Sequence, residues 1–242
     1  MKTKHYLLIG ALGLLVLAFV FRKKLFPKLT EKLAKKSPNL KNLLNLGKME
    51  VPNPDKIYTI DTTQSLGVAH LQFLKLKEGG LSKDPSDSAS ANPVPDGSGY
   101  HTNKGVTWST FVSNASELGY SPTPKNFYEM PNSIWTKIWS KRFYKPMQKT
   151  ESDLINRTLS NWAWGSGTGG ANALVNFIGG YEKINEMLSE KGEKYTLGFL
   201  VNARDEFYKR LIEKKPKNAK FLKGWQRANY NWYYHFQNYA KS

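Results

Sequence analysis

The residues Lys77-Glu78-Gly79-Gly80 are the part of the chain whose types and order most clearly allow chemistry. Glu78 ends an apolar stretch with helical spacing. The negative end of a helix dipole and partial burial both favour a protonated carboxyl group there, so we expect a raised pKa. A general acid that works near neutral pH needs such a pKa. An ordinary helix end also reads Glu-Gly-Gly, so the spacing alone leaves a catalytic and a structural role open.

The polar segment after the glycines offers the second group that an acid-catalysed hydrolysis needs. Residues 81–106 form a long loop rich in Ser, Asp, Asn, Pro and Gly. Such loops in compact domains are usually functional or disordered. Asp87, Asp96 and Thr102 each bring a carboxylate or a hydroxyl that can position water. An acid with such a partner is the arrangement that glycoside hydrolysis uses.

Further short motifs follow in a fixed order along the chain. They are Glu78-Gly79-Gly80, Asp87, Thr102-Asn103-Lys104-Gly105-Val106-Thr107, Phe143-Tyr144-Lys145-Pro146-Met147, Trp164-Gly165-Ser166-Gly167, and then Arg204, Phe207, Tyr208, Phe221, Gly224-Trp225 and Arg227. This ordered set resembles glycoside hydrolase family 108 over about residues 64–235. The resemblance implies a lysozyme-like fold, a muramidase activity and a C-terminal peptidoglycan-binding-like region.

The resemblance also implies catalytic roles. Glu78 would protonate the glycosidic oxygen of a MurNAc-β-1,4-GlcNAc bond, and Thr102 or an Asp would hold the attacking water. The chain departs from the family pattern where residues 88–101 separate Asp87 from Thr102. Asp96 therefore competes with Asp87 for the role of the Asp, and we favour Asp87 because of its distance from Glu78.

Four residues are candidate substrate contacts: Asp96, His101, Asn161 and Trp164. Asn161 would meet acetamido groups, and Trp164 would stack on a pyranose ring. Trp164 also belongs to a set of tryptophans at helical spacing that favours a core role, namely Trp135, Trp139, Trp162 and Trp164. The glycines of residues 165–170 resemble a phosphate cradle. They lack the following Lys and the preceding strand of a nucleotide loop, which favours a helix start near the cleft.

Composition bounds the function classes. The 242 residues are 40% hydrophobic, enough for a core, and contain no cysteine, which excludes disulfides and thiolate metal sites. The four histidines show no ligand spacing, so we expect neither a metal nor a cofactor. The net charge of +17 favours an anionic partner such as a wall polymer, lipid headgroups or nucleic acid. The aromatic tail 230–236 lacks a nucleic-acid-binding motif, so we interpret it as a core seam.

The N-terminus reads as a membrane segment. Residues 6–21 carry no charge and would span roughly 24 Å as a helix, with lysines and arginines on both sides. Small residues for signal cleavage are missing after the apolar run, which favours an uncleaved anchor in a bacterial envelope or a virion membrane. The basic flank at residues 22–24 would by itself place the body on the cytoplasmic side, so the orientation stays open.

The remaining elements must position the candidate site. Helical patterns are expected from Thr62 or Thr63 to Glu78 and over 108–118, 131–144, 151–163, 169–179, 181–190, 195–214 and 218–239, with at most a small β-hairpin near 95–107. We therefore expect a mainly α domain behind one transmembrane helix, and the family resemblance implies that this domain is lysozyme-like. The predicted regions are 1–24 (anchor), 25–56 (basic stalk and linker), 57–190 (catalytic region) and 191–242 (peptidoglycan-binding-like region).

These expectations combine into a membrane-anchored peptidoglycan hydrolase with a lytic or virion-associated role in a phage. A lytic transglycosylase is the near alternative, because it also needs one acid. A wall-binding protein that has lost activity is the alternative from a different class. The expected partners are peptidoglycan and, through residues 6–21, lipid, and we expect no nucleic acid.

Overall fold

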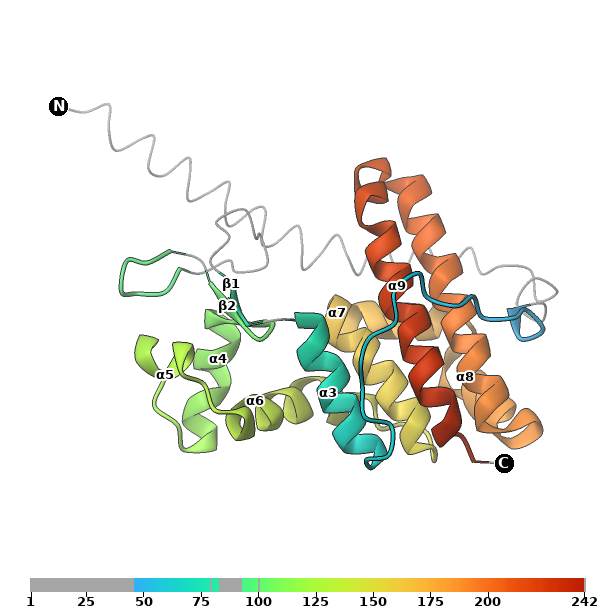
Figure 1. Ribbon diagram of the computed structural model, residues 1–242, viewed down its shortest axis with the longest axis horizontal. Coiled ribbons are helices and arrows are strands. Elements are labelled where there is room, and N and C mark those ends of the chain that lie inside the picture. Colours follow the sequence, from blue (N-terminus) through green and yellow to red (C-terminus); the bar gives the residue numbers. More distant parts are fainter. Residues whose placement is uncertain (1–45, 79, 83–92, 100, 242) are drawn as a thin grey trace.

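The computed structural model describes residues 46–78, 80–82, 93–99 and 101–241. Within these ranges the chain is mainly α-helical, as the sequence predicts (Figure 1). The helices are α3 (Leu66–Glu78), α4 (Trp108–Ala115), α5 (Pro124–Tyr128), α6 (Asn132–Trp139), α7 (Asp153–Phe177), α8 (Gly180–Lys214) and α9 (Ala219–Phe236). The predicted membrane segment 6–21 lies outside the described residues. In the ranges that are described, no helix is long and apolar enough to cross a membrane.

A small antiparallel sheet follows α3. Its strands are β1 (Leu81–Ser82), β2 (Thr102–Asn103) and β3 (Val106–Thr107), in the order β1-β2-β3. The hairpin between β2 and β3 turns at Lys104 and Gly105, which both have positive φ angles of 51° and 77°. Two successive positive φ angles define the tight turn that joins twisted antiparallel strands. The hairpin expected near 95–107 is therefore present, and it is confined to 102–107.

Two glycines divide the long helices. Gly167 has φ 75° and ψ 161° inside α7, and Gly192 has φ 78° and ψ 176° inside α8. Both angle pairs are far from helical values, so each helix kinks there. These kinks explain why the sequence shows separate helical patterns on the two sides of each glycine. The predicted boundary at 190/191 falls next to Gly192, inside α8.

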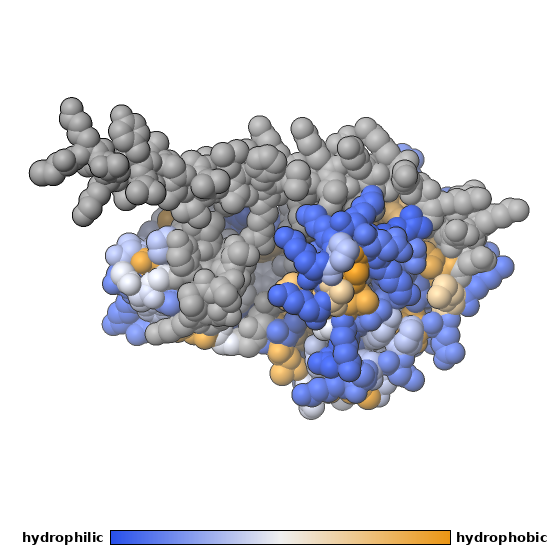
Figure 2. Space-filling model, turned by 90° about the horizontal axis from the view of Figure 1, so that it is seen from above, coloured by the Kyte–Doolittle hydropathy of each residue, from blue (hydrophilic) through white to orange (hydrophobic). Residues whose placement is uncertain are grey.

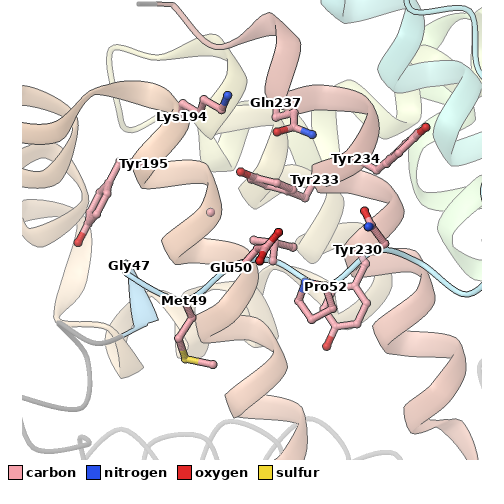
Figure 3. Close-up of a pocket in the computed structure, with 13 residues that line it drawn as sticks. Gly47, Met49, Glu50, Pro52, Lys194, Tyr195, Tyr230, Tyr233, Tyr234 and Gln237 are labelled. Atoms are coloured by element: carbon pink, nitrogen blue, oxygen red, sulfur yellow. The ribbon is translucent and has the colours of Figure 1, made fainter.

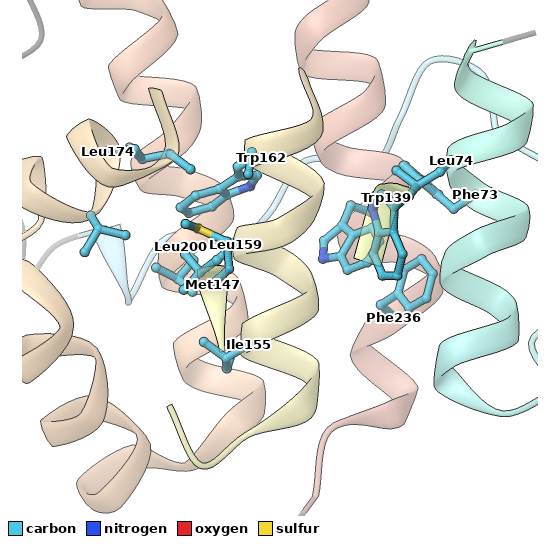
Figure 4. Packing of buried hydrophobic residues seen from close by; sticks show 14 of the residues in the cluster. Phe73, Leu74, Trp139, Met147, Ile155, Leu159, Trp162, Leu174, Leu200 and Phe236 are labelled. Atoms are coloured by element: carbon cyan, nitrogen blue, oxygen red, sulfur yellow. The ribbon is translucent and has the colours of Figure 1, made fainter. Parts of the chain in front are cut away.

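Aromatic and aliphatic side chains fill the space around α7. Figure 4 shows one group with Phe73, Trp139 and Phe236 on one side of this helix, and a second with Trp162 and Leu200 on the other. The aromatic tail is part of the first group, because Trp232 and Phe236 are fully buried and stack with ring centroids 3.9 Å apart. The core seam expected for the tail thus holds for Trp232 and Phe236, whereas Tyr234 is 40% exposed.

The segment 46–61, called the strap here, begins with a turn at residues 46–49 and then crosses α8 and α9 without helical or strand structure (Figure 1). Asn202 of α8 donates to the carbonyls of Leu46 and Met49 at 2.9 and 3.0 Å. Asn231 of α9 accepts a hydrogen bond from the backbone N–H of Tyr58 at 2.7 Å. The folded body therefore begins at least eleven residues before Ile57, where the sequence pattern first indicates a domain.

The start of α3 differs from the expectation. The helix begins at Leu66 and not after Thr62 or Thr63. The Asp61 carboxylate accepts hydrogen bonds from the backbone and hydroxyl of Thr63 and from Gln64. Asp side chains that bond to the backbone two residues later form a turn, and this turn delays the helix.

Candidate functional site

Glu78 is the last residue of α3, as the sequence predicts. The helix is held in place by Phe73 and Leu74, which are fully buried one turn earlier. The described part of the structure contains the backbone position of Glu78 but not its side chain. Asp87 lies outside the described residues. The structure therefore gives the place of the predicted acid on the backbone, at the end of α3.

The sheet brings Thr102 close to the end of α3 in the fold. Ser82 of β1, four residues after Glu78, pairs with Thr102 of β2. The backbone N–H of Lys104 donates to the carbonyl of Gly80 at 3.1 Å, which ties the hairpin to the segment that leaves α3. The chain therefore carries two of the three predicted catalytic residues, Glu78 and Thr102, into one short stretch of sheet and helix end. Thr102 itself is nine-tenths buried, at 9% exposure.

The hairpin is fixed to the helices behind it. Trp135 of α6 donates from Nε1 to the carbonyl of Lys104 at 2.9 Å. The Lys104 ammonium donates to the carbonyl of Met130 at 2.7 Å and to Asn132. Burial, followed by the charge of Lys75, lowers the pKa of Lys104. These bonds make the hairpin turn a rigid support for Thr102.

The kinked part of α7 forms the other side of this region. A Cβ placed on Gly165 would lie 3.2 Å from the Lys77 ammonium and 3.7 Å from a guanidinium nitrogen of Arg204. Gly165 therefore allows the end of α3 and the middle of α8 to meet at α7. Trp164, its neighbour, is half-buried with its ring edge-on to Trp135, centroids 5.6 Å apart.

Arg204 gives this region a buried positive charge. It is 6% exposed, and its guanidinium lies 5.4 Å from the ring centroids of both Trp162 and Tyr208. Burial lowers its pKa, an effect that the charge interaction and then the hydrogen bond with Tyr208 partly offset. Among the residues with described side chains, no carboxylate forms an ion pair with Arg204. Nearby cations favour the ionised form of a carboxyl group and so lower its pKa. The local sequence around Glu78 does not reveal this influence.

Asp96 and His101 belong to a separate polar cluster in the loop before β2. The Asp96 carboxylate accepts hydrogen bonds from the Ser98 hydroxyl and backbone and, at 2.8 Å, from the Tyr128 hydroxyl. These bonds, those from Ser98 above all, lower the pKa of Asp96. His101 Nε2 lies 3.0 Å from the Ser98 hydroxyl, and the imidazole is buried against Tyr128. Asp96 is therefore an ionised group that holds the loop in shape.

Asn161 lies inside the helical body. It is 2% exposed, one turn before Trp164 on α7, and its Oδ1 has no hydrogen-bond partner among the described residues. The structure thus places this candidate in the core behind the kink and not on an open surface. Trp135, Trp139 and Trp162 are also buried, which confirms the core role expected for them.

The sequence reasoning missed how three residues contribute here. Arg204 was noted only through the family resemblance. A charged residue among the apolar positions of α8 is a signal that the sequence reasoning could have used. Tyr128 and Trp135 contribute through hydrogen bonds to loop and hairpin, and no sequence pattern indicates such long-range partners. Within the described ranges, no group of three acidic or histidine side chains is placed to hold a metal ion.

A cavity of about 300 Å³ lies elsewhere, between the strap, α8 and α9 (Figure 3). Its lining includes Glu50, Lys194 and the tyrosines Tyr195, Tyr230, Tyr233 and Tyr234. Burial, and then the charge of Glu50, raises the pKa of Tyr233. None of the predicted site residues lines this cavity, so it is distinct from the region around the end of α3.

No protein-family model, no curated protein and no solved structure matches this chain. The resemblance to glycoside hydrolase family 108 therefore stays a prediction from the motifs.

Proposed function

We propose that the protein is a membrane-anchored N-acetylmuramidase of lysozyme-like fold, in which Glu78 is the general acid. Its substrate would be the MurNAc-β-1,4-GlcNAc bond of peptidoglycan. Residues 6–21 would hold it in a bacterial envelope or a virion membrane, and the wall polymer would be its main partner.

The arrangement around the end of α3 is the observation that supports this proposal. The helix that ends at Glu78 continues into a small sheet that carries Thr102, and the same helix end meets the α7 kink beside Trp164. An acid, a hydroxyl and an aromatic ring from three parts of the sequence are thus gathered in one region. These are the group types that a glycosidase needs for protonation, for water and for contact with a sugar ring.

The proposed reaction follows from these groups. Glu78 donates its proton to the glycosidic oxygen as the bond to the anomeric carbon breaks, and the sugar ring takes up the positive charge. A water held by Thr102 or by an Asp then attacks the anomeric carbon, and its proton passes to the Asp carboxylate or to solvent. Asp87 is our choice for this Asp, because Asp96 is already engaged with Ser98 and Tyr128.

Clearing of isolated cell walls by the full chain and by Glu78→Gln tests the proposal. Loss of a general acid typically lowers the rate about 10²–10⁴-fold, and we expect a loss in this range. Glu129→Gln is the matched control, because Glu129 is an exposed glutamate just after α5. Equal clearing by native protein and Glu78→Gln would remove Glu78 from the mechanism.

Mass spectra of the released fragments separate the proposed hydrolase from a transglycosylase. Hydrolysis leaves reducing MurNAc ends, whereas a transglycosylase uses the 6-hydroxyl of the sugar and leaves anhydro ends. Binding to walls without any fragment release would instead favour an inactive wall-binding protein.

A further inference from the structure

The turn between α8 and α9 carries an unusual concentration of positive charge. Residues 212–224, called the basic tip here, contain five lysines and one acidic residue, Glu213. Four of these lysines are exposed: Lys214, Lys217, Lys220 and Lys223. Figure 2, which views the molecule of Figure 1 from its top, shows hydrophilic residues gathered around a small hydrophobic spot in the region where α8 ends and α9 begins.

Helix stability does not account for this charge. Lysines at the C-terminal end of α8 offset the negative end of its dipole, so Lys214 has a local explanation. Lys220 and Lys223 stand in the first turns of α9, at the positive end of that dipole, where cations are unfavourable. The ammonium of Lys223 lies 3.6 Å from the Asp55 carboxylate, and the Lys223 side chain is 80% exposed. A weak exposed pair of this kind contributes little to stability.

An exposed aromatic ridge accompanies the lysines. Phe221 is 47% exposed, and its ring stacks on Trp225 with centroids 5.9 Å apart. Trp225 in turn packs on Tyr208 of α8 at 5.1 Å, which supports the ridge from behind. The Lys220 ammonium lies 4.9 Å from the Phe221 ring. A large apolar ring held at the surface among cations is costly in water and suits a partner that is both anionic and partly apolar.

The tip also stands away from the candidate site. Ten residues of α8 separate Arg204, which lies beside Gly165, from Lys214. At 1.5 Å per residue this places the tip about 15 Å beyond the level of the α7 kink. The tip can therefore contact a surface that does not itself enter the region around Glu78.

We propose that the basic tip docks on the surface of an anionic lipid bilayer, with the lysines on headgroup phosphates and Phe221 at the interface. Lysines near such a surface are attracted to anionic lipid, and aromatic rings favour the headgroup level. The 21 residues between Lys24 and Leu46 could extend over at most roughly 75 Å, so the bilayer of the expected anchor is within reach of the body. The proposal rests on the membrane anchor of the proposed function but not on its enzymatic activity.

A fluorescent probe on the tip tests this docking. The chain has no cysteine, so Lys217→Cys in the full-length protein gives a single labelling site for an environment-sensitive dye. Lys125→Cys is the matched control, because Lys125 is also exposed and lies in α5, well away from the tip (Figure 1). Both proteins are reconstituted in vesicles of neutral phosphatidylcholine alone or with 30% phosphatidylglycerol.

We expect a blue shift and stronger quenching by brominated lipid at position 217 in the anionic vesicles, and no such change at position 125. High salt should reverse the effect. Replacement of Lys214, Lys220 and Lys223 by Ala should lower the ratio of docked to free tip about fivefold for each lysine. Phe221→Ser should weaken quenching while the salt dependence remains.

Identical spectra at both positions, or an equal response in neutral vesicles, would overturn the proposal. The proposal would also be overturned if the dye at position 217 responded to soluble polyphosphate but not to anionic vesicles. The tip would then bind a phosphate polymer and not a bilayer. Wall clearing measured on the same lysine variants keeps the two proposals apart, since a failure of docking says nothing about Glu78.

Discussion

His70 makes the stability of the protein depend on pH in a way that can be calculated. Its imidazole is fully buried in α3, with its ring edge-on to Trp139 at 5.0 Å and to Trp232 at 4.7 Å between centroids. Neither nitrogen has a hydrogen-bond partner among the described residues. Burial, and then the charge of Arg157, holds the pKa of His70 well below 6.5.

The direction of the effect follows from proton binding. As the pH falls through 6.5, His70 takes up a proton in the unfolded chain but stays neutral in the folded protein. The unfolded state then binds more protons, so the free energy of unfolding decreases below pH 6.5 and is unaffected by His70 well above it. For a group that remains neutral when folded, the loss is about 1.4 kcal/mol at pH 5.5 and less than about 0.1 kcal/mol at pH 7.5.

Urea unfolding of the full chain in detergent, followed by tryptophan fluorescence at pH 7.5 and 5.5, measures this loss. His70→Leu should be at least as stable as the native protein at pH 7.5, because it removes two buried nitrogens without partners. Between the two pH values the native protein should lose about 1.4 kcal/mol more than the variant.

Phe236→Leu is the matched control. Its ring lies 6.3 Å from that of His70, and the substitution leaves space in the same cluster without removing a titrating group. It should lower the free energy of unfolding by about 1 kcal/mol or more, equally at both pH values. Parallel losses in the native protein and His70→Leu would refute the assignment of the acid sensitivity to His70.

Two further substitutions probe the site and the strap. Gly165→Ala should keep or raise the free energy of unfolding by up to about 1 kcal/mol, because Ala favours a helix and the Lys77 side chain can shift aside. The same methyl group should reduce wall clearing, and unchanged clearing would place Gly165 outside the substrate path. Asn202→Ala removes the donor to the carbonyls of Leu46 and Met49 and should cost about 1–3 kcal/mol. Limited tryptic digestion should then cleave this part of the strap faster, and an unchanged cleavage rate would contradict the assigned role of Asn202.

Several features of the fold followed from local sequence. The end of α3 at Glu78 was predicted from the glycines after it. The helical pattern expected from residue 108 is α4, which Thr107 caps by accepting a hydrogen bond from the backbone of Thr110. The kink at Gly167 matches the break between two helical patterns. In each case a few neighbouring residues decide the backbone angles, so the pattern carries the information. The short helix α5 was missed, because five residues hold too little periodicity to be recognised.

The surroundings of the candidate site depended on residues far apart in the chain. Lys77 and Arg204 are 127 positions apart in sequence, yet both reach Gly165. Asp96 looked like a free carboxylate in a polar loop until the fold placed Tyr128 against it. Such contacts depend on how whole helices pack, and no local pattern specifies that packing.

The sequence by itself therefore determined where α3 stops, that a small hairpin precedes α4 and that Trp135, Trp139 and Trp162 are buried, because backbone preferences and hydrophobic spacing act over a few residues. Only the tertiary structure decided that a buried arginine lies beside the kink of α7, that the strap belongs to the folded body and that His70 sits among aromatic rings. Those environments form where helices that are distant in sequence pack together and exclude water. The exclusion of water changes the charge state of each side chain and the groups that it can contact.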